Sequence, residues 1–483
     1  MKRSVFVLLT ILAIAAITVF LACGTTGSTT TGTGTRTTGG GSSSANITTT
    51  LSDPTTCTAP QGPYSHIYVT VVDVKASTNA SAPDNDSSFV DLTPDLKNAP
   101  IQIDLLGAAV SQCFLATLGS NQPLAAGTYQ QIRVILADNA AGTKPAGNKC
   151  GTDANCVQLA ADNSIHTLQL SSESQTGIKI PTEQIESGSG FTATGGASQN
   201  LNLDFDACAS VVIQGNGSFR LKPVLHAGEI STASTSISGR LVDKTTSATI
   251  VGGKSIVALE QKDSTGVDRV IMQTVPDVSG AFNFCPVPAG TYDLVATAVN
   301  GTGVAYAATI TTGVQPGASL GNIPMVAQTG TSTAPASLTG LVTTASATAG
   351  VAADVSVSAL QSVVLSTTST VNFTIPLAQQ SSSTASVSTA ATSSSLTCPT
   401  NTDCAKYTLS VPATAPTVGA FSTTATTYTA STNAASYTVQ AHAFIPLSGG
   451  KDNCSPPIVT SSAVPVTAGN SFTVPNLTLT GCQ

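Results

Sequence analysis

Residues 201–206 read LNLDFD, and this short stretch decides the class of fold. In an extended chain, successive side chains point to opposite faces. The apolar residues of the stretch therefore share one face: Leu201, Leu203 and Phe205. The polar residues share the other face: Asn202, Asp204 and Asp206. Such an alternation is typical of a β-strand that covers a core with one side, so we predict a strand here.

The same kind of pattern recurs on both sides of this stretch. The predicted strands are rich in β-branched residues and are separated by Gly, Ser, Asn and Asp, as turns require. They are residues 67–74, 101–105, 128–136, 166–170, 201–206 and 219–225. Helical periodicity is weak, and short helices are expected only near residues 105–109 and 208–213. We therefore predict a mainly β module over residues 59–229.

A second β module is predicted for residues 234–328. It contains SISGRLVD at 236–243 and AGTYDLVATA at 289–298, with further strand patterns at short spacing between them. Short strands separated by turn residues are the pattern of a small β-sandwich.

A third β module, residues 335–483, resembles a longer and diverged copy of the second. SLTGLV at 337–342 echoes SISGRLV, and ASYTVQAHAF at 435–444 echoes AGTYDLVATA. Similar motifs at matching offsets indicate an internal repeat, here of tandem sandwiches. The copy carries a Ser/Thr/Ala-rich insertion at residues 379–396, which we expect to be a mobile loop.

The N-terminus predicts export from the cytoplasm. Lys2 and Arg3 precede an apolar run over residues 5–21, which is the shape of a signal peptide over residues 1–22. Residues 20–23 read FLAC and resemble a bacterial lipobox. That resemblance implies cleavage before Cys23 and lipidation of this cysteine. The alternatives are an ordinary secretory signal or a retained helix, for which 17 apolar residues are at the short limit.

Residues 24–50 consist almost entirely of Gly, Ser and Thr. A stretch of this composition is expected to stay disordered, because it has too little apolar surface to bury. We therefore predict that residues 23–58 comprise the acylated cysteine and a disordered tether. As a flexible coil, the 27 residues 24–50 would reach roughly 30 Å.

The 11 cysteines agree with an oxidising compartment, because ten remain after Cys23 is set aside. Spacing predicts three disulfides: Cys150 with Cys156, Cys398 with Cys404, and Cys454 with Cys482. Four cysteines are left, and they allow three pairings: Cys57, Cys113, Cys208 and Cys285. Zinc binding is disfavoured, since the sequence has no CxxC motif and no Cys/His cluster.

Composition excludes several classes of function. Only 9% of residues are charged and the net charge is −7, so the chain has no basic surface for nucleic acid. The metalloprotease motif HExxH is absent from the sequence. There is no Trp and only 4% of residues are aromatic, which weakens the case for sugar binding.

Residues 65–227 resemble the DUF4382 family, a domain of unknown function found in bacterial secreted proteins and lipoproteins. The matching pieces are HIYVTVVDVKAS (66–77), IDLL (103–106), AAGTYQQIRVIL (125–136), GIKIP (177–181), LDFDACASVV (203–212) and GSFRLKPVL (217–225). The second module resembles the carboxypeptidase regulatory-like family, a prealbumin-type β-sandwich, through ISGRLVD and SGAFNFCPVPAGTYDLVA. The latter class is often grouped with carbohydrate-binding-like folds, which is an analogy of fold and not of site.

The polar face of LNLDFD is the candidate site. Asp204 and Asp206, with Asn202 beside them, could supply oxygen ligands for Ca²⁺ or act as an acid/base pair. Two structural alternatives stay open. These residues could form the solvent face of an antiparallel strand, or they could cap a turn near Ala207.

These features together predict a non-enzymatic, lipid-anchored bacterial envelope protein with a structural, adhesive or ligand-binding role. A carbohydrate-binding or polysaccharide-associated surface module is the alternative, and an unrecognised hydrolase in the first module is a second one. The expected partners are the membrane, through the lipid, and envelope polysaccharide or surface proteins. The expected location is the outer membrane or cell surface, on the extracytoplasmic side.

Overall fold

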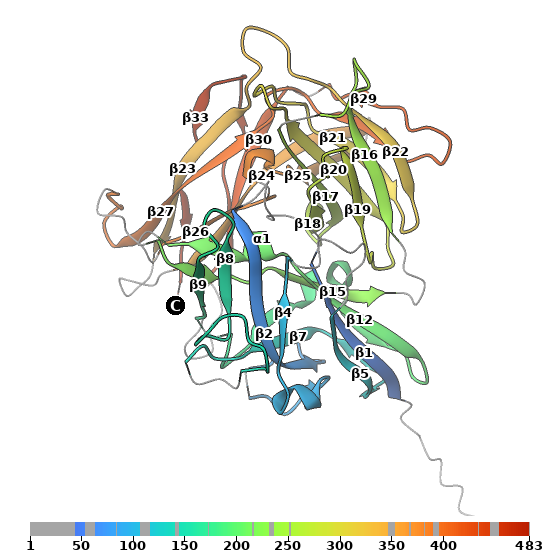
Figure 1. Cartoon of the computed structure of the whole chain (residues 1–483). Coiled ribbons are helices and arrows are strands. Elements are labelled where there is room, and N and C mark those ends of the chain that lie inside the picture. Colours follow the sequence, from blue (N-terminus) through green and yellow to red (C-terminus); the bar gives the residue numbers. More distant parts are fainter. Residues whose placement is uncertain are drawn as a thin grey trace, which may run out of the picture. The chain divides into compact units, whose positions relative to one another are not determined.

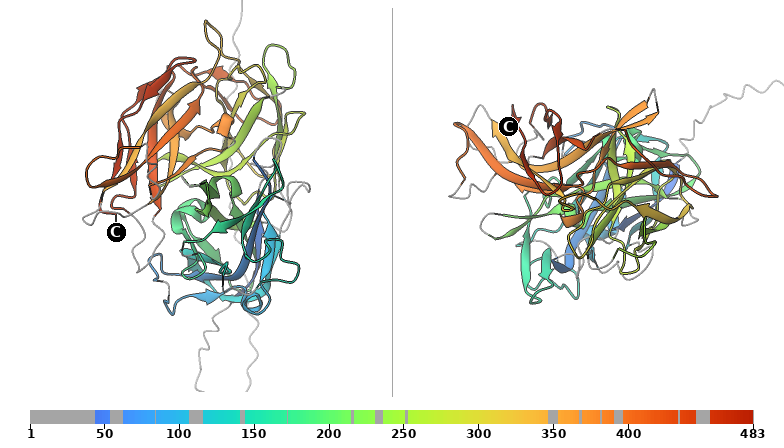
Figure 2. Two further views of the ribbon diagram at one scale, coloured as in Figure 1. Left: turned by 60° about the vertical axis from the view of Figure 1, so that its left-hand side comes forward. Right: turned by 90° about the horizontal axis from the view of Figure 1, so that it is seen from above.

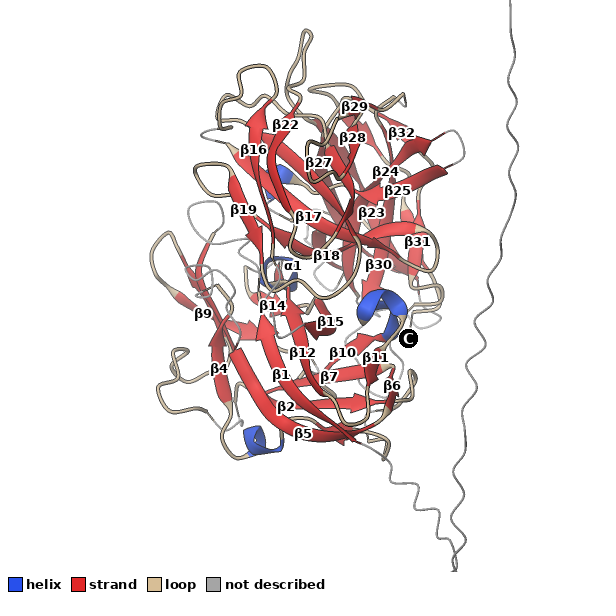
Figure 3. Cartoon of the chain, turned by 90° about the vertical axis from the view of Figure 1, so that its right-hand side faces the viewer, coloured by secondary structure: helices blue, strands red, loops and turns tan. Residues whose placement is uncertain are grey.

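The computed structural model describes residues 44–482 apart from short internal gaps. The gaps are residues 54–62, 84, 107–115, 141–143, 172, 215–216, 231–235, 251–252, 346–352, 367–368, 381, 390–395, 433 and 445–453. The predicted signal peptide, Cys23 and residues 24–43 lie outside the described residues. Within them the regular elements are strands, apart from one short α-helix and a few 3₁₀ turns (Figure 3). The prediction of a mainly β fold is confirmed.

The first module contains a four-stranded sheet, called sheet A here, in the order β15-β12-β1-β5. Its strands are β1 (Ser44–Ser52), β5 (Ala116–Ala125), β12 (Ser198–Phe205) and β15 (Leu225–Ile230). Strand β1 runs parallel to β12 and antiparallel to β5, so both of its edges are paired. The predicted strand at LNLDFD is therefore an inner strand of sheet A.

Strand β1 corrects the prediction of a disordered tether over residues 23–58 for the part from Ser44 to Ser52. Ala45, Ile47 and Leu51 are at most 1% exposed, so this segment contributes to the core. The threonines between them are β-branched and suit a strand. Composition alone predicts disorder because the apolar residues are few, but three of them are enough once two partner strands pair with the segment.

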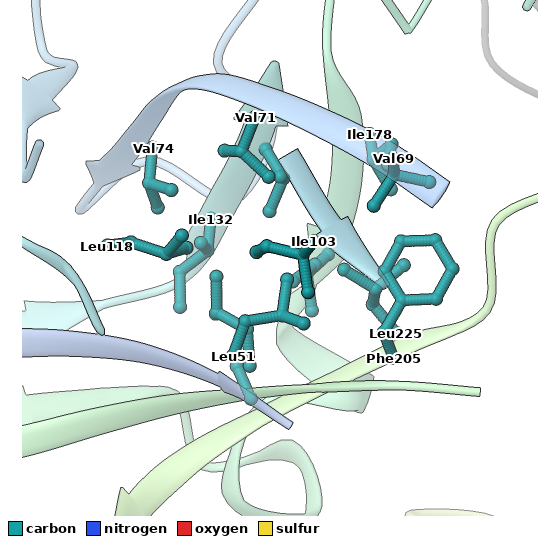
Figure 4. Close-up of a cluster of buried hydrophobic side chains, with 14 of the residues drawn as sticks. Leu51, Val69, Val71, Val74, Ile103, Leu118, Ile132, Ile178, Phe205 and Leu225 are labelled. Atoms are coloured by element: carbon teal, nitrogen blue, oxygen red, sulfur yellow. The ribbon is translucent and has the colours of Figure 1, made fainter. Parts of the chain in front are cut away.

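A second sheet of the first module has the order β10-β7-β2-β8-β9-β14-β13, with β3 and β4 paired to β2. Its strands are β2 (Tyr64–Ser77), β3 (Val90–Asp91), β4 (Ile101–Asp104), β7 (Gln131–Leu136), β8 (Cys156–Leu159), β9 (Ile165–Gln169), β10 (Ile178–Pro181), β13 (Val211–Ile213) and β14 (Phe219–Leu221). A small pair, β6 (Gly127–Tyr129) and β11 (Phe191–Ala193), and the 3₁₀ turns η1 (Pro94–Lys97), η3 (Thr182–Gln184) and η4 (Glu186–Gly188) complete the module. Side chains of sheet A, such as Leu51 and Phe205, pack against side chains of this sheet, such as Val71 (Figure 4).

The helix predicted near residues 208–213 is shorter than expected. Helix α1 (Ala207–Ser210) has only four residues, and strand β13 follows it directly. Of the segment 105–109, Leu105 and Leu106 lie in a turn and the rest lies outside the described residues.

The second and third modules share one large sheet, in which β29-β28-β21-β20-β17-β18-β25-β24-β30-β31 follow one another (Figure 1). The strands from the second module are β16 (Ile237–Asp243), β17 (Lys254–Lys262), β18 (Val267–Thr274), β19 (Ala281–Phe284), β20 (Tyr292–Val299), β21 (Thr309–Val314) and β22 (Ser319–Met325). Strands β19, β16 and β22 form a separate sheet opposite the shared one.

The third module supplies the remaining strands. They are β23 (Ala336–Ala345), β24 (Asp354–Ser366), β25 (Ser369–Thr374), β26 (Ala385–Ser388), β27 (Thr402–Val411), β28 (Thr417–Ala420), β29 (Thr429–Ala430), β30 (Ser436–Phe444), β31 (Ile458–Thr460), β32 (Val464–Pro465), β33 (Ser471–Thr473) and β34 (Leu477–Leu479). Strands β27, β23, β33 and β34 form its second sheet, and η5 (Ala378–Gln380) precedes β26.

The third module covers both edges of the second module's part of the shared sheet. Strand β25 pairs with β18 at one edge, and β28 pairs with β21 at the other. Val295 and Ile310 of the second module also belong to the core cluster of the third. The yellow and orange strands accordingly run side by side in both views of Figure 2. The tandem modules are thus joined by pairing and packing, and edges that could recruit another chain are occupied.

The insertion at residues 379–396 is only partly a loop. Residues Ala385–Ser388 form β26, which pairs with β24, so the expectation of a mobile loop is wrong for this part. Residues 390–395 lie outside the described residues.

One corner motif occurs in two modules. The sequence AGTY appears at 126–129 and at 289–292, with Gly127 and Gly290 both at φ 155°. In each copy the buried tyrosine hydroxyl donates to a carbonyl four residues earlier: Tyr129 to Ala125 over 3.1 Å, and Tyr292 to Pro288 over 2.9 Å. This is the geometry of a tyrosine corner, which fixes where the chain enters a strand.

Three disulfides are formed in the structure, Cys150–Cys156, Cys398–Cys404 and Cys454–Cys482, and they are the pairs predicted from spacing. Cys285 is also disulfide-bonded. Cys57, Cys113 and the side chain of Cys208 lie outside the described residues. In the described part of the chain, none of the helices has the length and apolarity needed to cross a membrane.

Candidate functional site

The polar face of β12 is joined to β1 by a chain of hydrogen bonds. The parallel register places Thr50 beside Asn202 and Ser52 beside Asp204. Thr50 Oγ1 donates to Asn202 Oδ1 over 3.0 Å, and Asn202 Nδ2 donates to Ser52 Oγ over 2.8 Å. Ser52 Oγ then donates to Asp204 Oδ1 over 3.0 Å. Every donor in this chain points toward Asp204; the bond from Ser52 lowers the pKa of that carboxyl group, but by less than burial raises it.

This face is buried, which corrects the expectation of a solvent face. Asn202 is 2% exposed and Asp204 is 6% exposed. The covering comes partly from the second module. Gly228 lies opposite Asn202 on β15, and it is in close contact with Pro288 of the second module: a methyl group on Gly228 would lie 3.4 Å from that proline. The two polar residues of β12 therefore lie within the protein, where polar groups must find partners.

Asp206 takes the capping role that was considered above. It is the N-cap residue of α1, and its Oδ1 accepts from the backbone N–H of Ala209 over 3.0 Å. Its Oδ2 accepts from Gln273 of the second module. Both oxygens thus have structural partners, and the second of them ties the first module to the second.

Asp53 is a member of this cluster that sequence reasoning missed. It follows β1 directly, is 8% exposed and accepts weakly from the N–H of Ala207 over 3.4 Å. Its Oδ2 is buried and has no hydrogen-bond partner in the described residues. The composition of residues 23–58 predicts a tether, but the alternation of Ile47, Thr49 and Leu51 shortly before Asp53 is a signal that identifies this residue.

Burial controls the protonation of these carboxyl groups. It raises the pKa of Asp53 and that of Asp204 well above their ordinary values, and the nearby Asp206 raises both further. Within the described residues, neither Asp53 nor Asp204 forms an ion pair. His226 lies opposite Asp204 on β15, but burial lowers the pKa of His226 to about 4, so it is neutral at pH 7. The cluster therefore favours protonated carboxyl groups.

This arrangement does not support calcium binding or acid/base chemistry at Asp204 and Asp206. Asp204 Oδ1 and both carboxylate oxygens of Asp206 already accept hydrogen bonds, from Ser52, Ala209 and Gln273. In the part of the chain that the structure describes, no group of three or more His, Cys, Asp or Glu side chains is arranged to hold a metal ion. A buried carboxyl group without access for a substrate also makes a poor general base. The contacts assign the two residues to packing between strands and modules.

The second module has a groove of about 830 Å³. Two of the turns beside it are held by Asx side chains. Asp277 accepts from the backbone N–H of Ser279, and Asn300 accepts from that of Thr302, each two residues on. Leu241 and Val299 contribute apolar surface, and the lining residues include no aromatic side chain. Such turns give a preformed shape but no evident catalytic group.

Comparison with solved structures finds distant likeness to bacterial proteins. The Bacillus anthracis TIE protein is 11% identical, with a TM-score of 0.16, over 91% of this chain and 50% of its own. The shaft pilin SpaA from Lactobacillus rhamnosus GG is 11% identical, with a TM-score of 0.17, over 59% of this chain and 98% of its own. A streptococcal ancillary pilin is 9% identical, with a TM-score of 0.16, over 89% of this chain and 99% of its own. TM-scores this low support no inference about function. This chain spans about half the length of the TIE protein.

No curated protein matches the chain. A family match does exist for the first module. The model of the family described as "Domain of unknown function (DUF4382)" matches residues 44–223. The match begins at the first residue of β1, which is independent support for counting this strand as part of the domain. Residues 44–223 thus match the DUF4382 model, in agreement with the resemblance of their sequence motifs.

Proposed function

We propose that the protein is a non-enzymatic, lipid-anchored protein of the bacterial cell surface with a structural role. Lipid on Cys23 would hold the chain at the membrane, and the β modules would stand outside it. The observation that carries this proposal is the position of β1. It begins 21 residues after Cys23 and is paired on both edges inside sheet A.

An inner strand suits the attachment of an anchor. A force from the membrane would reach β1 first and would have to break its hydrogen bonds with both β12 and β5. It would also have to pull Ala45, Ile47 and Leu51 out of the core. A terminal strand paired on one edge only would resist less, because fewer bonds hold it.

The joined second and third modules also support a structural role. Pairing at β18–β25 and at β21–β28 restricts hinge motion between these modules. Thr309 Oγ1 and Thr417 Oγ1 share a hydrogen bond of 3.0 Å across the second of these contacts. A stiff unit of this kind is what a spacer or a scaffold at the surface needs.

The anchor is tested by comparing wild-type protein with Cys23→Ala in the native host. We expect the wild-type protein in the membrane fraction, with a mature N-terminus whose mass shows fatty acyl groups on Cys23. The variant should lose the label from a fed fatty acid and leave the membrane fraction. Ser44→Ala is the matched control, because Ser44 is exposed and lies at the start of the folded body. An unmodified N-terminus on the wild-type protein would overturn the proposal.

A polysaccharide-associated role is the second candidate, and the groove of the second module favours it. We infer from the sequence resemblance that this module is a carboxypeptidase regulatory-like sandwich. The groove offers hydroxyl, amide and backbone groups around a small apolar floor. Retention of the protein on immobilised envelope polysaccharide, lost in Asn300→Leu and kept in Ser44→Ala, would support this role. Absence of retention on the host's own polysaccharide would remove it.

The hydrolase alternative has little support from the geometry. Its candidate residue Asp204 is 6% exposed and is hydrogen-bonded to Ser52. A substrate would have to displace the second module from sheet A to reach it.

A further inference from the structure

The contact at which the second module meets the third contains buried acids. Strands β18 and β25 pair there in parallel, through only two registered residue pairs, Val267 with Asn372 and Asp268 with Phe373. Two further hydrogen bonds come from Thr374: its N–H donates to Glu260 Oε2 over 3.2 Å, and its Oγ1 donates to the carbonyl of Asp268 over 2.7 Å. The seam, defined as β25 with the parts of β17 and β18 that hold it, is therefore short.

Three acidic side chains gather beside the seam. Glu260 on β17 is opposite Asp293 on β20, and Asp268 lies on the neighbouring strand β18. Glu260 is 0% exposed and Asp268 is 1% exposed. Burial of two such groups side by side is unfavourable if both are ionised, because each loses hydration and repels the other.

The acids are incompletely paired. Glu260 Oε1 and Asp268 Oδ2 are buried and have no hydrogen-bond partner in the described residues. The nearby cations do not neutralise them. Arg269 Nε donates to Asp263 Oδ2 over 2.9 Å and its Nη1 donates to Gln440, while Lys262 is exposed at the end of β17.

We propose that protons on Glu260 and Asp268 keep this seam closed, so that a rise in pH releases β25 from β18 and loosens the third module from the second. A protonated Asp268 can donate a hydrogen bond to the carboxylate of Asp293. A protonated Glu260 still accepts the N–H of Thr374 but carries no charge. When both lose their protons, two buried charges are left that Arg269 and Lys262 do not neutralise, and the pairing beside them weakens.

The pKa shifts of these groups agree with this inference. Burial, followed by the charge of Asp293, raises the pKa of Asp268 to about 7. Burial raises the pKa of Glu260 well above its ordinary value, with a contribution from Asp268. The other charged groups facing the pair come from β17, β18, β20 and the turn after β17: Lys262, Arg269, Asp293 and Asp263. Strand β25, with the sequence STVNFT, contributes no titratable side chain.

A bound cation is the competing way to neutralise the acids. The described residues include no group of three or more His, Cys, Asp or Glu side chains arranged to hold a metal ion. Protons therefore explain the buried carboxyl groups with fewer assumptions, and the test below separates the two explanations.

Hydrogen exchange of the full chain between pH 6 and 8.5 tests the proposal. After correction for the intrinsic exchange rate, peptides covering β25 should lose protection as the pH rises. Each proton released on opening changes the opening equilibrium roughly tenfold per pH unit. Peptides covering β20, in the middle of the sheet, should keep their protection. The double variant Glu260→Gln, Asp268→Asn should show no such pH dependence, because its amides never ionise.

Asp277→Asn is the matched control. It also removes one carboxylate from the second module, and Asn300 shows that Asn holds the same kind of turn. This variant should behave as the wild type does. Protection of β25 in the wild type that does not change with pH would overturn the proposal, whether or not the double variant folds. A shift in that protection on adding CaCl₂ or EDTA at pH 8 would also overturn it, in favour of a cation.

Discussion

Ser52 Oγ lies 3.0 Å from Asp204 Oδ1 and joins the last residue of β1 to a strand that comes 152 residues later in the chain. Both residues are buried, at 2% and 6% exposure. This bond connects the segment nearest the predicted anchor with the residue that sequence analysis singled out as a candidate site. It gives Asp204 a role in holding β1 in sheet A.

Substitution Ser52→Ala should therefore destabilise the first module. It removes the donor to Asp204 and the acceptor of Asn202, and it leaves buried polar groups unpaired. We expect a loss of about 1–3 kcal/mol in the free energy of unfolding. Urea denaturation of the purified chain measures it. Ser44→Ala, at the exposed start of the same strand, should change stability by less than about 0.5 kcal/mol. Equal effects of the two substitutions would contradict the role given to the bond.

Acidification from pH 8 to pH 5 should stabilise the folded protein through Asp53 and Asp204. Burial raises the pKa of both groups in the fold above the value in the unfolded chain. The folded state therefore holds more protons in this range, and stability is lost as the pH rises from the unfolded pKa through the folded one. Asp204→Asn should flatten the dependence of the melting temperature on pH. An unchanged slope in that variant would argue against a protonated Asp204.

Below about pH 4 the trend should reverse. Turn carboxylates such as those of Asp263 and Asp277 have lowered pKa values, because the hydroxyl and N–H groups of their own turns stabilise the charged form. Their contribution is present at higher pH and is lost as the pH falls through the folded pKa. A melting temperature that kept rising down to pH 2 would contradict this assignment.

Local patterns in the sequence predicted much of the first module. The alternation at LNLDFD corresponds to β12, and the β-branched run at residues 67–74 lies within β2. The three disulfides were predictable because small loops and a terminal pair constrain the partners by distance along the chain. In each case the determining contacts are near in sequence or repeat with a fixed period.

Non-local pairing was beyond this kind of reasoning. Strand β1 depends on β12 and β5, whose residues come about 150 and 70 positions later, and its Thr-rich composition alone suggests disorder. The face of β12 at Asn202 is covered partly by Pro288 of the second module. The pairing of β18 with β25 joins two modules that sequence patterns treat as separate. Periodicity identifies strands but does not say which of them are neighbours.

The core position of Ile47 offers a direct test of β1. Ile47 is 0% exposed, so Ile47→Ala should cost about 2–5 kcal/mol. A disordered tether would tolerate the same change without effect. Thr48→Ala, at a partly exposed position one residue on, is the control and should cost much less. Differential scanning calorimetry of the two variants decides between a core strand and a tether.

The two AGTY corners should contribute alike to stability. Tyr292→Phe removes the hydroxyl that donates to Pro288, and Tyr129→Phe removes the one that donates to Ala125. Each substitution keeps the ring in the core and leaves one carbonyl without its partner, so we expect a loss of about 0.5–1.5 kcal/mol in each case. Because the two tyrosines belong to different core clusters, the double variant should lose the sum of the two effects. Chemical denaturation of the three variants measures these losses, and a double variant no less stable than either single one would mean that the corners do not act independently.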